Sequence, residues 1–98
     1  MIKPGSKDRK ARILITGMEL DELQRFDWMI AEAFGLDRRI ANYQGVLPIG
    51  LYRWDIECLV DVINSALEDP EYYPTHDTPE YRALKNLRDR LQAEENAL

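Results

Sequence analysis

The fold that we expect depends on the stretch LYRWDIECLVDVINSAL, residues 51–67. At about 100° of rotation per residue, the apolar side chains of this stretch gather on one broad face of a helix. These side chains are Tyr52, Ile56, Leu59, Val60, Ile63, Ala66 and Leu67. A face of this breadth is typical of a helix that packs against several neighbours, so we predict that residues 51–67 form the central helix.

A second amphipathic segment lies before it, at residues 17–34. The side chains on its apolar face are Leu20, Leu23, Phe26, Ile30, Ala33 and Phe34. Thr16 and Glu19 have the spacing of a capping box, in which each side chain bonds the backbone amide of the other residue. Gly35 follows the segment, and a glycine in the left-handed conformation commonly ends a helix. We therefore predict a first helix over residues 17–34.

The third helix is predicted over residues 79–95. Thr78 suits the N-cap, Pro79 the first helical position, and Glu80 the positive end of the helix dipole. A narrow apolar stripe follows, made of Leu84, Leu87 and Leu91. A helix with so narrow a stripe either covers the core from outside or seats its stripe in a partner.

The N-terminal part contains a strand-like segment at residues 12–16, where Ile13 and Ile15 are β-branched. No strong partner strand follows, because Pro48 argues against a central strand in the apolar segment 46–49. Residues 37–42 are compatible with a short helical turn.

Together these segments predict a mainly α fold, a small three-helix domain over residues 12–98. It carries a short N-terminal strand-like segment and a flexible basic N-terminal arm at residues 1–11. The 98 residues fit one domain. A chain of this size buries only roughly 60–65% of the surface that its unfolded form exposes. A second subunit that covers leftover apolar surface would therefore stabilise it.

The charge of the chain is uneven. The net charge is −5, but residues 1–12 hold five cations and one acid, which leaves +4 there and −9 on the rest. A basic arm on an acidic body is the main charge asymmetry.

The one cysteine, Cys58, cannot form an internal disulfide, and a domain with a lone thiol fits a reducing compartment. We see no signal peptide and no apolar run near the roughly 20 residues that span a bilayer. We expect a cytoplasmic protein without membrane contact.

Few residues suggest chemistry. His76 is the single histidine, close to Asp69, Glu71 and Asp77. A zinc site commonly needs three or four convergent ligands, so we interpret His76 as a solvated loop residue. Cys58 is interpreted as a buried, inert thiol near the edge of the apolar face of the central helix. We therefore expect no catalytic residue, no metal and no cofactor, and a protein that is not an enzyme.

Asp27 falls within the apolar face of the predicted first helix, where an unpaired carboxylate is costly. We expect Arg38, Arg39 or Arg53 to pair with it, or Asp27 to lie at the edge of the core. The alternative is an acid with a perturbed pKa in a cleft.

Several apolar residues are candidates for an interface. Trp28 projects toward the polar side of its helix, and exposed tryptophans are enriched at interaction hot spots. Trp54 falls near Asp61 if its helix begins at Leu51, and packs on Leu59 if Asp55 is the N-cap.

The other interface candidates lie outside the helices. Tyr72 and Tyr73 either contact a partner or cover the gap between the second and third helices, and we favour the covering role. Ile13 and Ile15 belong to the segment that lacks an internal partner, so it is expected to pair with its copy across a two-fold axis.

The leading functional hypothesis is a non-enzymatic protein that acts through protein–protein interaction, as a homodimer or a subunit of an assembly. The alternative is a nucleic-acid-associated regulator. Its phosphate contacts would be Lys7, Arg9, Lys10 and Arg12. The arm has no aromatic residues for base stacking and the body is acidic, so a solubilising tail is the preferred interpretation of the arm. An acidic mimic of nucleic acid also fits the charge.

Overall fold

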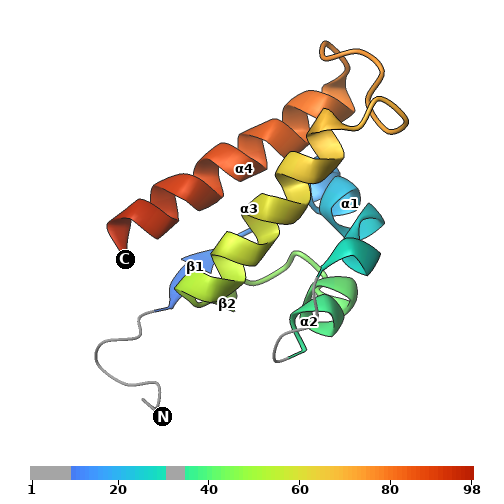
Figure 1. Cartoon of the computed structure of the whole chain (residues 1–98). Coiled ribbons are helices and arrows are strands. Elements are labelled where there is room, and N and C mark those ends of the chain that lie inside the picture. Colours follow the sequence, from blue (N-terminus) through green and yellow to red (C-terminus); the bar gives the residue numbers. More distant parts are fainter. Residues whose placement is uncertain (1–9, 31–34) are drawn as a thin grey trace.

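Helices dominate the computed structural model of the chain, which describes residues 10–30 and 35–98 (Figure 1). The elements in these ranges are β1 (Ala11–Ile13), α1 (Gly17–Arg25), the short 3-10 helix η1 (Asp27–Met29), α2 (Leu36–Asn42), β2 (Ile49–Leu51), α3 (Arg53–Glu68) and α4 (Pro79–Ala97). The mainly α fold expected from the sequence is confirmed. None of these helices is both long enough and apolar enough to cross a bilayer.

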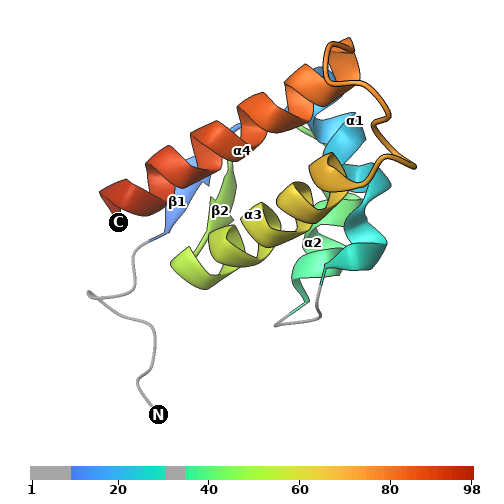
Figure 2. The same cartoon turned by 45° about the horizontal axis from the view of Figure 1, so that its top comes forward.

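The helix α3 is the centre of the fold, as its broad apolar face predicted. It runs beside α4, which also packs on α1 (Figure 1). The buried apolar residues of α3 are Ile56, Leu59, Val60, Val62, Ile63, Ala66 and Leu67. The stripe of Leu84, Leu87 and Leu91 on α4 is fully buried within the chain itself. The sheet lies near the start of α3 and the C-terminal half of α4, which Figure 2 shows from a second side.

The predicted first helix is shorter than expected. α1 ends at Arg25, because the backbone of Phe26 leaves the helical region and its amide bonds the Leu23 carbonyl. The break lets η1 pack against α2, so tertiary packing overrides a helical periodicity that continues through residues 26–30. Gly35 was expected to end the first helix. Its backbone is left-handed, with φ of 74°, but it is the N-cap of the next helix, α2.

The prediction that β1 has no internal partner is wrong. β1 pairs with β2 in an antiparallel sheet, with Arg12 opposite Gly50 and Ile13 opposite Ile49. Pro48 is compatible with this pairing, because it comes just before a strand at the edge of a two-stranded sheet. Ile13 and Ile15 are buried in the core of the same chain. The argument that this segment must pair with its copy in a second chain therefore no longer holds.

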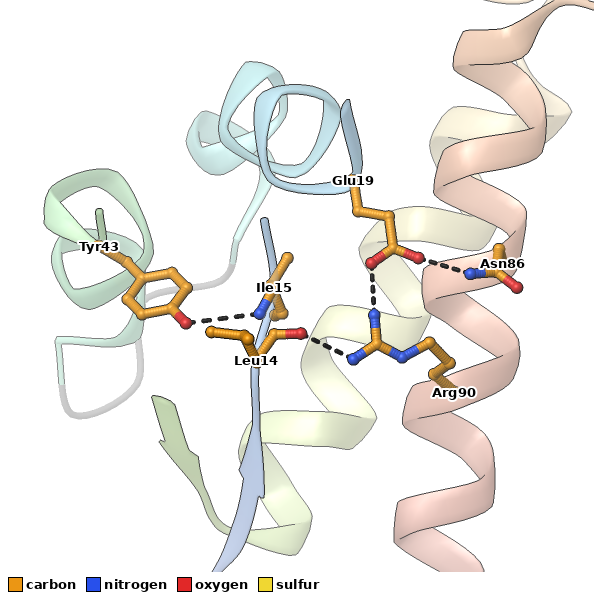
Figure 3. Close-up of polar contacts among 6 residues, drawn as sticks. All are labelled: Leu14, Ile15, Glu19, Tyr43, Asn86 and Arg90. Carbon is orange, nitrogen blue, oxygen red and sulfur yellow. Dashed lines mark hydrogen bonds and ion pairs between the residues drawn. The ribbon is translucent and has the colours of Figure 1, made fainter. Parts of the chain in front are cut away.

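The predicted capping box does not form. Thr16 is the N-cap of α1, but its side chain makes no capping hydrogen bond. Glu19 instead faces α4, where it accepts hydrogen bonds from Asn86, at 2.6 Å, and from Arg90 (Figure 3). Arg90 also donates to the Leu14 carbonyl at 2.7 Å. This charged contact replaces the local cap and ties α4 to both α1 and the end of β1.

Candidate interaction surface

The most exposed large apolar side chains in the described residues lie on the loop between α2 and β2. Val46 is 74% exposed and Leu47 is 73% exposed. Valine and leucine are among the residue types most often buried in folded proteins. Two of them side by side in solvent mark the segment 44–48, which we call the apolar loop, as a candidate contact surface.

Specific contacts hold the apolar loop in place. The Tyr43 hydroxyl donates to the Leu47 carbonyl at 2.5 Å. It accepts from the Ile15 amide at 3.4 Å, as Figure 3 shows. The Gln24 side-chain amide donates to the Tyr43 carbonyl at 2.8 Å. Gly45 has a φ of 73°, and a Cβ there would lie 2.9 Å from the Ile15 carbonyl oxygen. The loop thus packs against α1 and against the residues that follow β1.

A groove of about 650 Å³ adjoins the apolar loop, between α2 and the β2 edge of the sheet. Tyr43 and Arg39 line it from α2 and its end, Leu47 and Ile49 from the loop and β2, and Lys10 from the start of β1. Apolar side chains with a few polar groups among them are the usual lining of a binding groove.

An ion pair joins Arg39, which lines the groove, to the buried carboxylate of Asp55. Asp55, only 1% exposed, accepts from Arg39 Nη2 at 2.7 Å and from the Tyr52 amide at 3.0 Å through the same oxygen. Arg39 Nη1 also lies 3.4 Å from the Gly50 carbonyl. Asp55 is therefore at the third position of α3 rather than the N-cap, and it joins α2, β2 and α3.

The outer face of the sheet carries cations beside aromatic rings. Arg12 in β1 and its flanking residues Lys10 and Leu14 are exposed at alternate positions, while Ala11 and Ile13 face the core. Tyr52 stacks on Trp54, with ring centroids 4.6 Å apart and planes at 12°. Lys10 Nζ lies 5.1 Å from the centre of the Tyr52 ring. We call Lys10, Arg12, Tyr52 and Trp54 the ribbon face.

The other candidates lie elsewhere. Trp28, in η1, is 66% exposed, as its place on the polar side indicated. Tyr73 is buried and Tyr72 packs edge-on against Phe26 at 4.9 Å, so both cover the core. Lys7 and Arg9 lie outside the described residues, whereas Lys10 and Arg12 are exposed.

The polar candidates are spread over the fold. Asp27 is half-buried in η1, while Arg39 pairs with Asp55 and Arg53 donates to the Leu98 carbonyl at 3.0 Å. His76 is exposed and stacks on Tyr81 at 4.4 Å. Cys58 is partly buried in α3. Within residues 10–30 and 35–98, no three His, Cys, Asp or Glu side chains are grouped to hold a metal ion.

A second polar cluster joins α1 to the loop before α4. The Tyr73 hydroxyl donates to buried Glu22 at 2.5 Å, and Arg25 pairs with the same carboxylate oxygen at 3.3 Å. Burial raises the pKa of Tyr73 well above its usual value, and the hydrogen bond to Glu22 and the charge of Glu22 raise it further. The neutral phenol is the form that the fold stabilises.

We expect the stability of the protein to fall in alkaline solution because of Tyr73. The pKa of the Tyr73 hydroxyl is higher in the folded state than in the unfolded state, where it is about 10. The contribution of Tyr73 to the free energy of unfolding is therefore complete below about pH 10 and is lost as the pH rises through the pKa of the folded state. Tyr73→Phe is expected to cost about 1–2 kcal/mol at neutral pH and to remove this part of the pH dependence. Urea unfolding from neutral to alkaline pH measures both. Tyr72→Phe is the control that keeps the Tyr73 hydroxyl, and an unchanged alkaline slope in Tyr73→Phe would contradict the assignment.

Sequence reasoning missed the apolar loop and the Arg39–Asp55 pair. Gly45, Val46 and Pro48 were visible as a punctuated apolar segment, but nothing in it indicated which side chains face solvent. Asp55 and Arg39 are 16 residues apart, and only the fold brings them together. No family model, curated protein or solved structure matches this chain.

Proposed function

We propose that this chain is a non-enzymatic interaction domain that pairs with a second copy of itself through the apolar loop and the adjoining groove. The observation that carries the proposal is the exposure of Val46 and Leu47 on a loop that other elements hold in place. Water contact at both side chains is unfavourable, and a protein surface that covers them removes this cost.

A second copy suits this surface because the apolar loop and the groove adjoin each other. In a contact with two-fold symmetry, the same patch of both subunits must be self-complementary. A protruding apolar side chain beside an apolar-lined groove meets this condition, since Leu47 of each copy can enter the groove of the other. Tyr43 and Ile49 would then contact the incoming leucine.

The expected affinity is modest. Full burial of a valine or leucine side chain contributes about 1.5–3 kcal/mol, so four such side chains contribute about 6–12 kcal/mol. Association itself costs about 4–15 kcal/mol. Only the favourable ends of these two ranges leave a net gain of about 8 kcal/mol, which corresponds to a dissociation constant of about 1 µM, so the dimer is expected at micromolar concentrations or above.

Sedimentation equilibrium between about 1 and 100 µM tests the proposal. We expect the mass to rise from monomer to dimer over this range. Leu47→Asp is expected to stay monomeric, because it removes the apolar contact with Tyr43 and Ile49 and introduces a carboxylate that must lose its water on entering the groove. Met18→Asp is the matched control, since Met18 is also exposed but lies at the start of α1.

Two results would overturn the proposal. One is a wild-type chain that stays monomeric throughout, and the other is a Leu47→Asp variant that associates like the wild type. Circular dichroism of each variant checks that it remains folded.

A further inference from the structure

The ribbon face combines two features that separate segments of the sequence supply. β1 and the residue before it contribute the cations Arg12 and Lys10, while the aromatic rings come from the junction of β2 and α3. Sequence reasoning counted the lack of aromatic residues in the basic arm against nucleic-acid binding. The antiparallel pairing of β1 with β2 places Tyr52, which stacks on Trp54, beside Lys10.

We infer that the ribbon face binds single-stranded nucleic acid, with phosphates on the cations of β1 and a base on the exposed part of Trp54. Cationic surfaces with aromatic rings are the usual means by which proteins hold single strands without reading their sequence. Trp54 is 37% exposed and is already parallel to Tyr52, so a base that stacks on it extends an existing stack. In a duplex the faces of the bases are covered by their neighbours, so a single strand is the better ligand.

The cations lie on the outer face of the sheet beside Gly50. Arg12 lies opposite Gly50, which has no side chain, and the Lys10 side chain lies over it, since a Cβ at Gly50 would be 3.2 Å from Lys10 Cδ. Lys10 and Arg12 are two residues apart on a strand and project to the same side, about 7 Å apart. That separation is close to the spacing of successive phosphates in an extended single strand. The sequence before Lys10 adds the cations Lys3, Lys7 and Arg9.

The acidic part of the molecule restricts the path of the strand. Burial, a hydrogen bond with Glu57 and the charge of Glu57 raise the pKa of Glu95, while Arg53 lowers it and Asp61 raises it slightly. Three acidic side chains, Glu57, Asp61 and Glu95, therefore lie close together where α3 meets the end of α4. Phosphates would be repelled along that surface. We therefore expect the strand to follow β1 away from α3, with only one base reaching Trp54.

Fluorescence anisotropy with labelled oligo-dT and oligo-rU of about 12 nucleotides tests the inference at low salt. The expected affinity is about 1–100 µM, and it should fall steeply with added salt. In a Trp28→Phe background, oligonucleotide should quench the emission of Trp54. The double variant Lys10→Glu/Arg12→Glu should lose binding at least about tenfold.

The matched control is Arg82→Glu/Lys85→Glu, which changes the net charge equally. Both residues are exposed on the first half of α4, which lies away from the sheet (Figure 1). Equal losses in the two double variants would overturn the inference, because net charge alone would then account for binding. So would equal binding of a duplex of the same length, or oligo-glutamate competing as well as oligo-dT. Leu47→Asp should still bind the oligonucleotide, since Lys10 and Arg12 are unchanged. Lys10 also lines the groove of the proposed pairing, so oligonucleotide and a second copy are expected to compete in the wild type.

Discussion

Asp55→Ala is expected to lower the free energy of unfolding by about 3 kcal/mol. The carboxylate is buried and accepts hydrogen bonds both from Arg39 and from the Tyr52 amide at the start of α3. Breaking a fully buried ion pair costs about 3–5 kcal/mol, and losing a helix-capping contact about 1 kcal/mol. Arg39 is partly exposed and regains water when its partner is removed, which reduces the first of these costs.

Urea unfolding of three variants separates the two contributions. Asp55→Asn keeps an oxygen that can accept from the Tyr52 amide but removes the charge, so it should cost less than Asp55→Ala. Combining Asp55→Ala with Arg39→Met in a double-mutant cycle should give a coupling energy of about 1–3 kcal/mol. Independent, additive effects would show that the ion pair does not stabilise the junction of α2, β2 and α3.

Gly45→Ala is expected to destabilise the fold by about 2–4 kcal/mol and to weaken self-association. The left-handed backbone of Gly45 costs an alanine about 1 kcal/mol. The added Cβ would also lie 2.9 Å from the Ile15 carbonyl oxygen and from the Leu20 side chain. Because a backbone oxygen cannot move aside alone, the apolar loop must shift, at a further cost of about 1–3 kcal/mol.

Gly17→Ala is the matched control for this prediction. Gly17 also has a positive φ, of 59°, but a Cβ added there would meet no atom of another described segment within 4 Å. It should cost only the backbone contribution of about 1 kcal/mol and leave association unchanged. If both variants lose the same stability, the close contact beneath the apolar loop is unimportant.

The two long helices follow directly from local sequence. α4 begins at Pro79 with the Thr78 hydroxyl accepting from the Tyr81 amide at 3.2 Å, as the Thr-Pro-Glu start predicts. The broad apolar face of α3 predicted its central position. These features are readable because helical periodicity and capping depend on residues within a few positions of one another.

The candidate surfaces were less predictable from sequence. Trp28 was expected to be exposed and is, and Tyr73 covers the core, which was the favoured role, but Ile13 and Ile15 are core residues. Glu19 had the spacing of a local cap and contacts α4 instead. Each difference comes from a partner more than 30 residues away in the chain.

Sequence alone was sufficient for the helical class, the start of α4 and the positions of the apolar faces of α3 and α4, because these depend on interactions between near neighbours in the chain. The end of α1, the pairing of β1 with β2, the exposure of Val46 and Leu47 and the placement of Lys10 beside Tyr52 depend on contacts between distant segments. Such contacts form when the helices pack and bury their apolar faces together, and local periodicity carries no information about which distant residues then meet.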